Sequence, residues 1–376
     1  MLRLRSVCMP TTTRPASALP RNLALAYALL IAYASLHPFA GWKASGLPAF
    51  DFLVAPWPKY FVLADLVFNV LGYLPLGFLL VAALPGKWAA RRSILVATLA
   101  AGLLSLFLET AQNFLPSRVA SNVDLGGNTL GALLGTLPGM RWGRSLFGRD
   151  GRARRWRTRY VIGGNTGDAG LVLVGLWLLS QLTATDLLFA SGDVRNLLGI
   201  AAPLPFSAER FMAFDMALTT LSVLAIGLFA RCMMRHTTVW PLVLVLLLGV
   251  GAKTLATATF FVPGAPLAWL TPGTGRGLLL GGALLAGALM LPRVLQHALA
   301  GMTLLASTAL VNLMPENPYV VYEQRLTNFS NFLNFHGLTQ LTDSLWPFFA
   351  LAYLSAVGLW RGEHLSGRPD SRERRL

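Results

Sequence analysis

The sequence feature that most constrains the fold is the recurrence of long apolar segments. A helix that crosses a hydrocarbon core of about 30 Å needs about 20 mostly apolar residues. Helices satisfy their own backbone hydrogen bonds, which the bilayer interior cannot do for them. Such segments occur at residues 22–40, 61–83, 94–113, 125–140, 168–189, 211–231, 238–261, 276–291, 294–314 and 343–360. The sequence therefore predicts an all-α, polytopic integral membrane helical bundle of about ten transmembrane helices.

Composition agrees with residence in a membrane and excludes two other classes. Of the 376 residues, 55% are hydrophobic and 12% are charged, which is more apolar surface than a soluble core hides. The net charge of +15 would suit a nucleic-acid partner only if the basic residues gathered on a soluble domain, and no such domain is evident. Cys8 and Cys232 lie beside arginine-rich stretches that we place in the cytoplasm, so we expect no disulfide framework.

The distribution of Lys and Arg predicts the orientation, because short loops rich in these residues are retained in the cytoplasm. With the N-terminus inside, the cytoplasmic segments hold 23 of the 31 Lys and Arg residues, and Lys253 lies within a span. The external loops hold seven: Lys43, Lys59, Arg118, Arg195, Arg210, Arg276 and Arg325. Both termini are therefore predicted to be cytoplasmic, in a multi-pass protein of the bacterial cytoplasmic (inner) membrane.

The N-terminus imitates a signal peptide. Four arginines between Arg3 and Arg21 precede an apolar run that ends near the A-x-A sequence Ala32-Tyr33-Ala34. We favour an uncleaved first helix, and a cleaved signal is the alternative.

Charge runs divide the chain into five parts. These are a cytoplasmic basic N-terminus at 1–21, a four-helix transmembrane domain at 22–140, an arginine-rich cytoplasmic linker at 141–167, a six-helix transmembrane domain at 168–360 and a cytoplasmic basic tail at 361–376. The linker is interpreted as a solvated segment that fixes topology. The alternative is a patch that binds anionic lipid headgroups.

Polar residues of the first domain converge near the predicted outer surface. A carboxylate inside a span is costly, so each one is a candidate site until it is paired. Residues three or four apart share a helix face, which groups these side chains in pairs on the second, third and fourth spans. The candidate cluster is Asp65, Asn69, Glu109, Gln112, Arg118, Ser121, Asp124 and Asn128.

Small residues and a proline predict how the same helices pack. Gly127, Gly131 and Gly135 recur every four residues, which lets the fourth helix approach a neighbour closely. Pro75, followed by Gly77, is expected to kink the second span. We interpret these residues as structural.

The order and spacing of these residues resemble the signatures of VanZ-like membrane proteins. The resemblance rests on Asp65 with Asn69 and Pro75-Leu76-Gly77, on Glu109 with Gln112, and on Arg118-x-x-Ser121-x-x-Asp124-x-x-x-Asn128-x-x-Gly131. It covers residues 22 to about 140, and the remainder resembles the six-helix extension of longer bacterial members. The family takes its name from a protein linked to teicoplanin resistance. The resemblance thus implies a cell-envelope role and an effect on glycopeptide (teicoplanin) susceptibility, but no molecular activity.

The cluster allows several functions. Its carboxylates and amide oxygens suit Mg²⁺ or Ca²⁺, and Arg118 could bind a phosphate with two hydrogen bonds. One hypothesis is a headgroup site for a phosphorylated lipid-linked cell-wall or polysaccharide precursor. A second is a purely structural network in which Arg118 pairs with Asp124 or Glu109.

Two further hypotheses involve catalysis or transport. A metal-dependent enzyme acting on a lipid phosphate or pyrophosphate would use a metal-activated water. It is disfavoured because the cluster contains no His or Cys, and His37 nearby is interpreted as a solvated interfacial residue. A secondary transporter ranks third, because its halves should contain matching broken helices and none is evident.

The second domain offers weaker signals. Asp215 and Lys253 lie on successive predicted spans and are expected to form a salt bridge. Pro272-Gly273-Thr274-Gly275-Arg276 is only distantly similar to the Pro-Gly-x-Ser-Arg element of undecaprenyl-pyrophosphate phosphatases, because it lacks the serine. The polar and aromatic segment 315–341 is interpreted as a re-entrant interfacial lid. The alternatives are an interfacial helix lying on the membrane and a saccharide-contacting surface.

Overall fold

The computed structural model describes residues 19–37, 39, 41–43, 46, 48–56, 63–148, 151–183, 187–258, 265–317 and 333–366. These residues form helices and no strand, with one isolated bridge between Val161 and Met234, so the all-helical prediction is confirmed. A helix lies at each of the ten apolar segments. Most of the segment 315–341 is outside the described residues.

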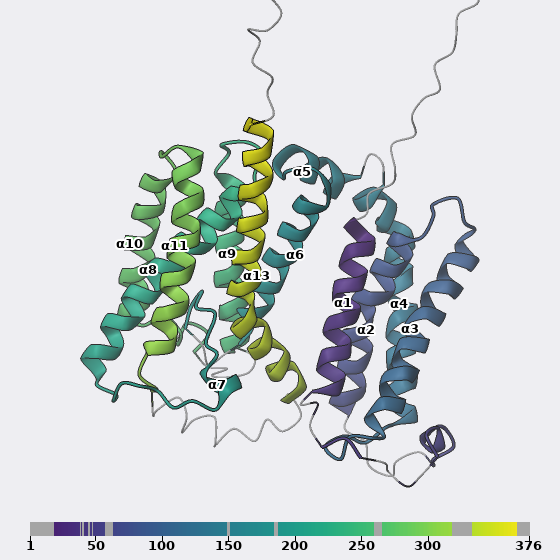
Figure 1. The fold of residues 1–376 in the computed structure, drawn as a ribbon. Helices are drawn as coiled ribbons and strands as arrows, with labels where there is room; N and C mark the ends of the chain where they lie inside the picture. Colours follow the sequence, from purple (N-terminus) through teal and green to yellow (C-terminus); the bar gives the residue numbers. More distant parts are fainter. Residues whose placement is uncertain are drawn as a thin grey trace, which may run out of the picture.

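The first four long helices form an N-terminal bundle. They are α1 (Leu19–Leu36), α2 (Leu63–Ala83), α3 (Ala90–Gln112) and α4 (Asn122–Phe147), with a short 3-10 helix, η1 (Asp51–Leu53), between the first two. The four run up and down beside one another (Figure 1). The helix α2 packs most extensively on α4, while α1 and α3 flank this pair. Its small core consists of Tyr73, Leu76, Ala101 and Ala132.

Glycines bring the backbones of α2 and α4 into contact. A Cβ atom added at Gly131 would lie 2.2 Å from the Val70 carbonyl oxygen, and one at Gly135 would lie 2.0 Å from that of Leu74. Gly77 of α2 makes the reciprocal approach, since a Cβ there would lie 2.0 Å from the Ala132 oxygen. Real Cβ atoms do not come this close to backbone oxygens, so the stripe of glycines sets the distance between the two helices.

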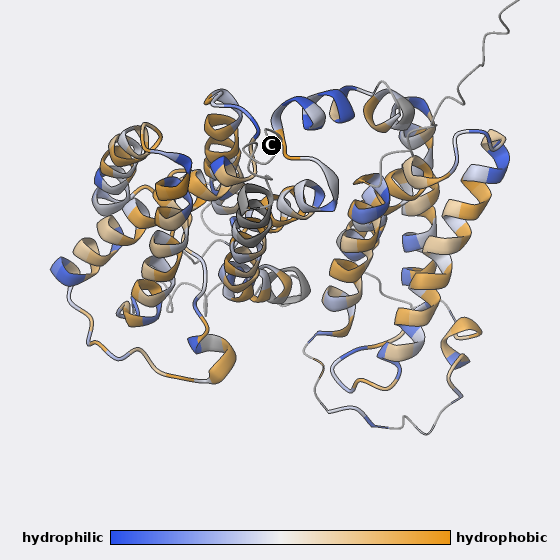
Figure 2. Ribbon diagram, turned by 45° about the horizontal axis from the view of Figure 1, so that its top comes forward, coloured by the Kyte–Doolittle hydropathy of each residue, from blue (hydrophilic) through white to orange (hydrophobic). Residues whose placement is uncertain are grey.

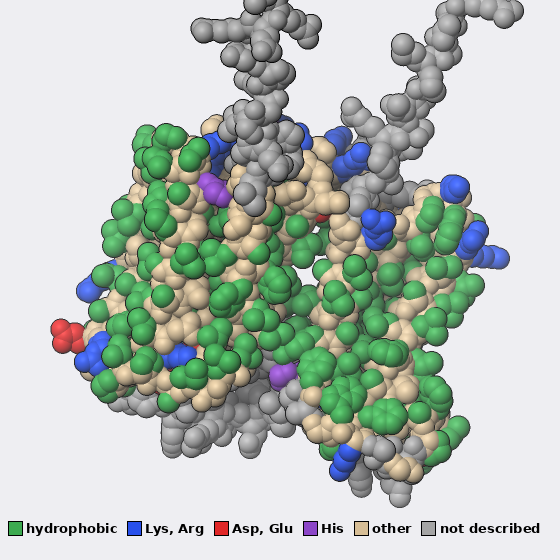
Figure 3. Space-filling view, in the orientation of Figure 1, with side chains coloured by type: hydrophobic (Ala, Val, Ile, Leu, Met, Phe, Trp, Pro, Cys, Tyr) green, Lys and Arg blue, Asp and Glu red, His purple; other side chains and the backbone are tan. Residues whose placement is uncertain are grey.

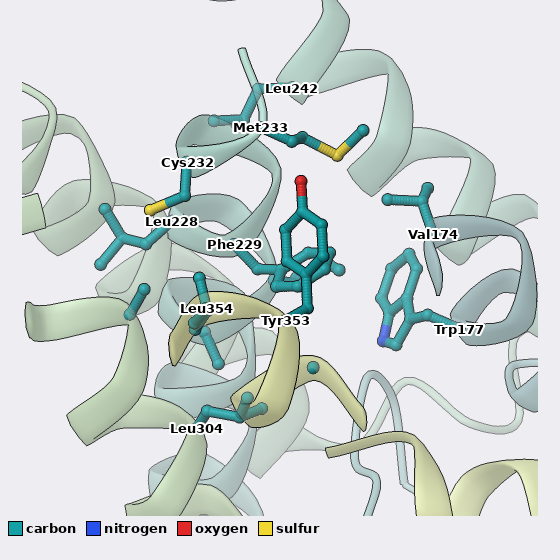
Figure 4. Packing of buried hydrophobic residues seen from close by; sticks show 14 of the residues in the cluster. Val174, Trp177, Leu228, Phe229, Cys232, Met233, Leu242, Leu304, Tyr353 and Leu354 are labelled. Carbon is teal, nitrogen blue, oxygen red and sulfur yellow. The ribbon is translucent and has the colours of Figure 1, made fainter. Parts of the chain in front are cut away.

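The remaining long helices form a C-terminal bundle. They are α6 (Gly164–Ser180), α8 (Ala208–Cys232), α9 (Trp240–Ala256), α10 (Pro272–Ala288), α11 (Arg293–Leu313) and α13 (Leu333–Ser366), together with the single turn α7 (Arg195–Leu198). The helix α8 packs on both α10 and α11. Figure 4 shows the large aromatic and aliphatic core, in which the tilted rings of Phe229 and Tyr353 have centroids 5.4 Å apart, near Trp177.

The linker between the bundles contains a helix, α5 (Arg152–Tyr160). It runs across the ends of the long helices instead of alongside them (Figures 1 and 2). Below it, α1 packs against α6 and α13. The Asn22 side chain of α1 also lies 3.5 Å from Asp168 of α6, within hydrogen-bonding distance.

The outer surface of both bundles is suited to lipid. Large apolar side chains project outward from the middle of the helices, including Leu103 and Phe107 of α3 and Leu279 of α10, which are 65%, 66% and 78% exposed. Figure 3 shows hydrophobic side chains over much of the face between the two ends of the molecule, with most Lys and Arg side chains near those ends. A surface so apolar indicates contact with a membrane.

Five described helices are long and apolar enough to cross a membrane: Leu19–Leu36, Asp65–Ala83, Ala90–Gln112, Ala208–Cys232 and Arg293–Leu313. The chain is thus a helical membrane protein. The count of ten spans and the side of each terminus stay predictions.

Candidate functional site

The candidate cluster lies at one end of the N-terminal bundle. The helix α3 ends at Gln112, α4 begins at Asn122, and the loop at 113–121 joins them. Because α2 and α4 both begin where α3 ends, the first turns of two helices and the last turn of a third meet there. This arrangement positions most of the polar residues singled out from the sequence.

Glu109 holds the loop between α3 and α4. Its carboxylate is 96% buried, at 4% exposure, and Oε2 accepts a hydrogen bond of 2.9 Å from the Ser121 backbone N–H. The Ser121 hydroxyl in turn accepts from the N–H groups of Val123 and Asp124, at 3.2 and 3.3 Å. A serine oxygen at this position caps α4, because the first N–H groups of a helix lack partners within it. Glu109 therefore fixes the residue that starts the next helix.

Asp124 is paired with an amide on α2. Asn69 Nδ2 donates a hydrogen bond of 2.7 Å to Asp124 Oδ1. Asp65, one turn before Asn69 on the same helix, has an exposed side chain. The sequence places Asp65 and Asn69 on one helix face, but of the two only Asn69 forms a hydrogen bond to α4.

Arg118 binds a backbone carbonyl. Its Nε and one terminal nitrogen donate to the His37 oxygen at 3.2 and 2.5 Å. Within the described part of the chain, it forms an ion pair with neither Glu109 nor Asp124. The structural hypothesis that paired Arg118 with one of these acids is therefore wrong in its partner: Glu109 accepts from the Ser121 N–H and Asp124 accepts from the Asn69 amide.

The last residue of α3, like Arg118, bonds to the end of α1. Gln112 Nε2 donates to the Ser35 carbonyl at 2.8 Å, and the Tyr33 hydroxyl lies 3.0 Å from His37 Nδ1. Burial lowers the pKa of the His37 imidazole, and the nearby Arg118 charge lowers it further. Burial likewise lowers the pKa of Arg118. His37 thus belongs to this end of the site, although the sequence alone favours a solvated interfacial residue.

Asn128 lies deeper, in the interior between α3 and α4. Its Nδ2 donates to the Ser105 hydroxyl at 3.0 Å, and the residue is 6% exposed. Its Oδ1 and the Tyr73 hydroxyl are both buried. The polar layer thus extends inward from the loop to Tyr73, which the sequence did not single out.

The acidic residues do not assemble a metal centre. No group of three or more His, Cys, Asp or Glu side chains in the described residues could hold an ion. The carboxylates of Glu109 and Asp124 accept from separate donors, and Asp65 is exposed. The arrangement does not favour the Mg²⁺ or Ca²⁺ site that the residue types suggested.

In the C-terminal bundle, Asp215 has partners other than the expected Lys253. The fully buried carboxylate accepts hydrogen bonds from the Thr274 N–H and hydroxyl, both at 3.0 Å, and from the Thr271 hydroxyl. Lys253 donates to the Thr183 carbonyl at 2.6 Å. The predicted salt bridge is therefore wrong, because donors at the start of α10 form the hydrogen bonds of the Asp215 carboxylate.

This arrangement also explains the glycine-containing sequence at the start of α10. Thr271 is the N-cap residue, and a Cβ atom at Gly273 would lie 2.6 Å from Asp215 Oδ2. The Pro-Gly-Thr sequence thus lets a helix N-terminus close onto a buried aspartate. In this chain, the residues that are distantly similar to a phosphatase element therefore have a structural role, the packing of α10 against Asp215.

The fold and this site define a helical membrane protein whose N-terminal bundle contains a polar layer at one end. Residues 11–140 match the VanZ/LLP1 family model. The N-terminal part of the chain is therefore a VanZ-like domain. No curated protein and no solved structure matches the chain.

Proposed function

We propose that the VanZ-like domain binds the phosphorylated headgroup of a lipid-linked cell-wall or polysaccharide precursor at the predicted outer leaflet. The observation that supports this function is the environment of Arg118. A guanidinium at the end of a membrane bundle is held by a carbonyl, and no carboxylate of the described chain neutralises it. Its charge is therefore available to an anion, and its remaining N–H groups suit phosphate oxygens.

The rest of the cluster orients this cation. Glu109 fixes Ser121, three residues after Arg118, and Gln112 fixes the end of α1 two residues before His37. A binding group whose position is fixed before the ligand arrives loses less entropy on binding. We assign Glu109, Gln112 and the Asn69–Asp124 pair a positioning role.

The alternatives rank lower. A metal-dependent enzyme acting on a lipid phosphate or pyrophosphate would need clustered ligands, which the described residues do not supply. For a secondary transporter we find no specific structural observation in its favour. An effect on teicoplanin susceptibility would follow from headgroup binding if the bound precursor is the one that the glycopeptide recognises.

The test uses the purified full-length protein in a nonionic detergent. An isoprenyl monophosphate and the matching isoprenol are titrated, and binding is measured by the rise in unfolding temperature. The phosphate should bind and the alcohol should not. Arg118→Gln should weaken phosphate binding by about tenfold or more, the effect of losing a charge-assisted hydrogen bond.

Arg210→Gln is the matched control. Arg210 is an exposed arginine on α8 that also donates to a backbone carbonyl, that of Pro205 at 2.7 Å. Arg210 lies in the other bundle, so the Arg210→Gln variant should bind the isoprenyl monophosphate with the wild-type affinity. Equal phosphate affinity in Arg118→Gln and the wild-type protein would exclude this function, as would equal binding of the alcohol. The same two variants, expressed in cells, would show whether teicoplanin susceptibility depends on Arg118.

A further inference from the structure

The helix α5 has an exposed arginine face. Arg152, Arg155 and Arg159 lie three and four residues apart, so they share one side of the helix, and all three side chains are exposed. The helix contains no acidic residue. Within the described chain, none of the three forms an ion pair.

Other residues fix α5 in place. Arg157 Nε forms an ion pair of 2.5 Å with Asp168 of α6, and its terminal nitrogen donates to the Gly164 carbonyl at 2.6 Å. Trp156 and Tyr160 pack edge-on against Trp240 of α9, with ring centroids 6.4 and 5.2 Å apart. Arg157 therefore has a structural role. The charges of Arg152, Arg155 and Arg159 are not used to hold the helix in place.

The position of α5 places this face at a membrane boundary. The helix lies across the ends of the apolar helices, next to the last turn of α4 and the first of α6 (Figures 1 and 2). This is the end opposite Arg118, because α4 begins beside Arg118 and ends beside α5. Its aromatic residues flank the arginines, a composition typical of interfacial helices.

We propose that α5 binds anionic phospholipid headgroups through Arg152, Arg155 and Arg159. Guanidinium groups bind phosphate oxygens with two hydrogen bonds, and a negatively charged leaflet attracts a basic segment at its surface. The helix is held by the protein on one side, so the lipid meets a preformed row of three cations. This site is separate from Arg118 and from the headgroup site proposed there.

The experiment compares lipids that differ in charge. The full-length protein in nonionic detergent is titrated with phosphatidylglycerol, with phosphatidylcholine of the same acyl chains, and with inorganic phosphate, and the unfolding temperature is recorded. Phosphatidylglycerol should stabilise the protein, and the other two should not. Arg152→Gln/Arg155→Gln/Arg159→Gln should raise the half-saturating concentration of phosphatidylglycerol by about tenfold or more.

A variant of equal charge is the control. Lys87→Gln/Arg91→Gln/Arg92→Gln removes three exposed cations from the turn between α2 and α3 and the first turn of α3, at the same end of the bundle. Its response to phosphatidylglycerol should stay within about twofold of the wild-type response. Equal losses in the two triple variants would overturn the proposal, because a diffuse effect of net charge would explain both. Stabilisation by phosphatidylcholine or by inorganic phosphate to the same extent would overturn it too.

Discussion

Asn69 of α2 donates a hydrogen bond of 2.7 Å to Asp124 of α4, at the end where Gly127 and Gly131 bring the two helices together. A polar bond therefore joins the same two helices as the glycine contact. Together they fix both the distance and the register of α2 and α4.

Asn69→Asp should destabilise the protein by removing the donor of this hydrogen bond. The variant replaces an amide donor with a carboxylate, so two acceptors face each other near Asp65. We expect a cost of about 1–3 kcal/mol at neutral pH, the usual effect of an unsatisfied and partly buried polar group. The free energy of unfolding in detergent measures it. The loss should shrink as the pH falls, because protonation of either carboxyl restores a donor.

The double variant Asn69→Asp/Asp124→Asn is the control for this prediction. It exchanges the donor and the acceptor and should recover most of the lost stability. If it is as unstable as the single variant, the hydrogen bond is not the cause of the effect.

Gly131→Ala should separate α2 from α4. The added methyl would lie 2.2 Å from the Val70 oxygen, a backbone atom that cannot move aside without the whole helix. We expect a loss of about 1–3 kcal/mol, as for other overpacked interiors. Gly126→Ala, five residues earlier on α4, meets no atom within 4 Å and should be neutral or slightly stabilising. Similar unfolding temperatures for the two variants would contradict the close approach.

The His37 imidazole should titrate below its ordinary pKa. Burial, the larger cause, and the Arg118 charge both favour the neutral ring, so the imidazole is harder to protonate in the folded protein than in the unfolded chain. A depressed folded-state pKa means that this contribution to stability is present above the unfolded pKa. It is lost as the pH falls through the folded pKa. NMR titration of the labelled imidazole, assigned with His37→Gln, gives the value. Arg118→Gln should raise it only in part, because burial is the larger cause.

The sequence predicts the helices well because the requirement that a bilayer imposes is local: an apolar run of sufficient length needs no distant partner. It places the Gly127, Gly131 and Gly135 stripe on one face of a helix for the same reason. Which neighbour meets that face depends on the tertiary arrangement, so α2 emerged only from the structure.

The hydrogen-bond partners of polar residues are less predictable, because the path of a loop determines which distant groups its residues meet. Arg118 reaches a carbonyl 81 residues away, that of His37, and no spacing rule connects the two. The linker illustrates a different difficulty. Its arginines predict a solvated segment that fixes topology, and part of that segment is the helix α5, in keeping with the high helix propensity of Arg and Ala. The contact of Trp156 with Trp240, which helps to hold this helix, joins residues far apart in the sequence and has no local signal.

The buried carboxylate of Asp215 gives the last prediction, in the C-terminal bundle. Thr274→Val keeps the shape of the side chain but removes a hydroxyl that donates to Asp215 at 3.0 Å, in a residue with no exposed surface. The backbone N–H of residue 274 still bonds to the carboxylate, so the loss should be partial, about 1–2 kcal/mol. Asp215→Ala should cost more, because it removes the carboxylate that accepts from the Thr274 N–H and from the hydroxyls of Thr219, Thr271 and Thr274. Thr158→Val, on the exposed face of α5, is the matched control and should change the unfolding free energy little. If a salt bridge to Lys253 held Asp215 instead, Thr274→Val would be as mild as Thr158→Val and Lys253→Met would reproduce the loss of Asp215→Ala.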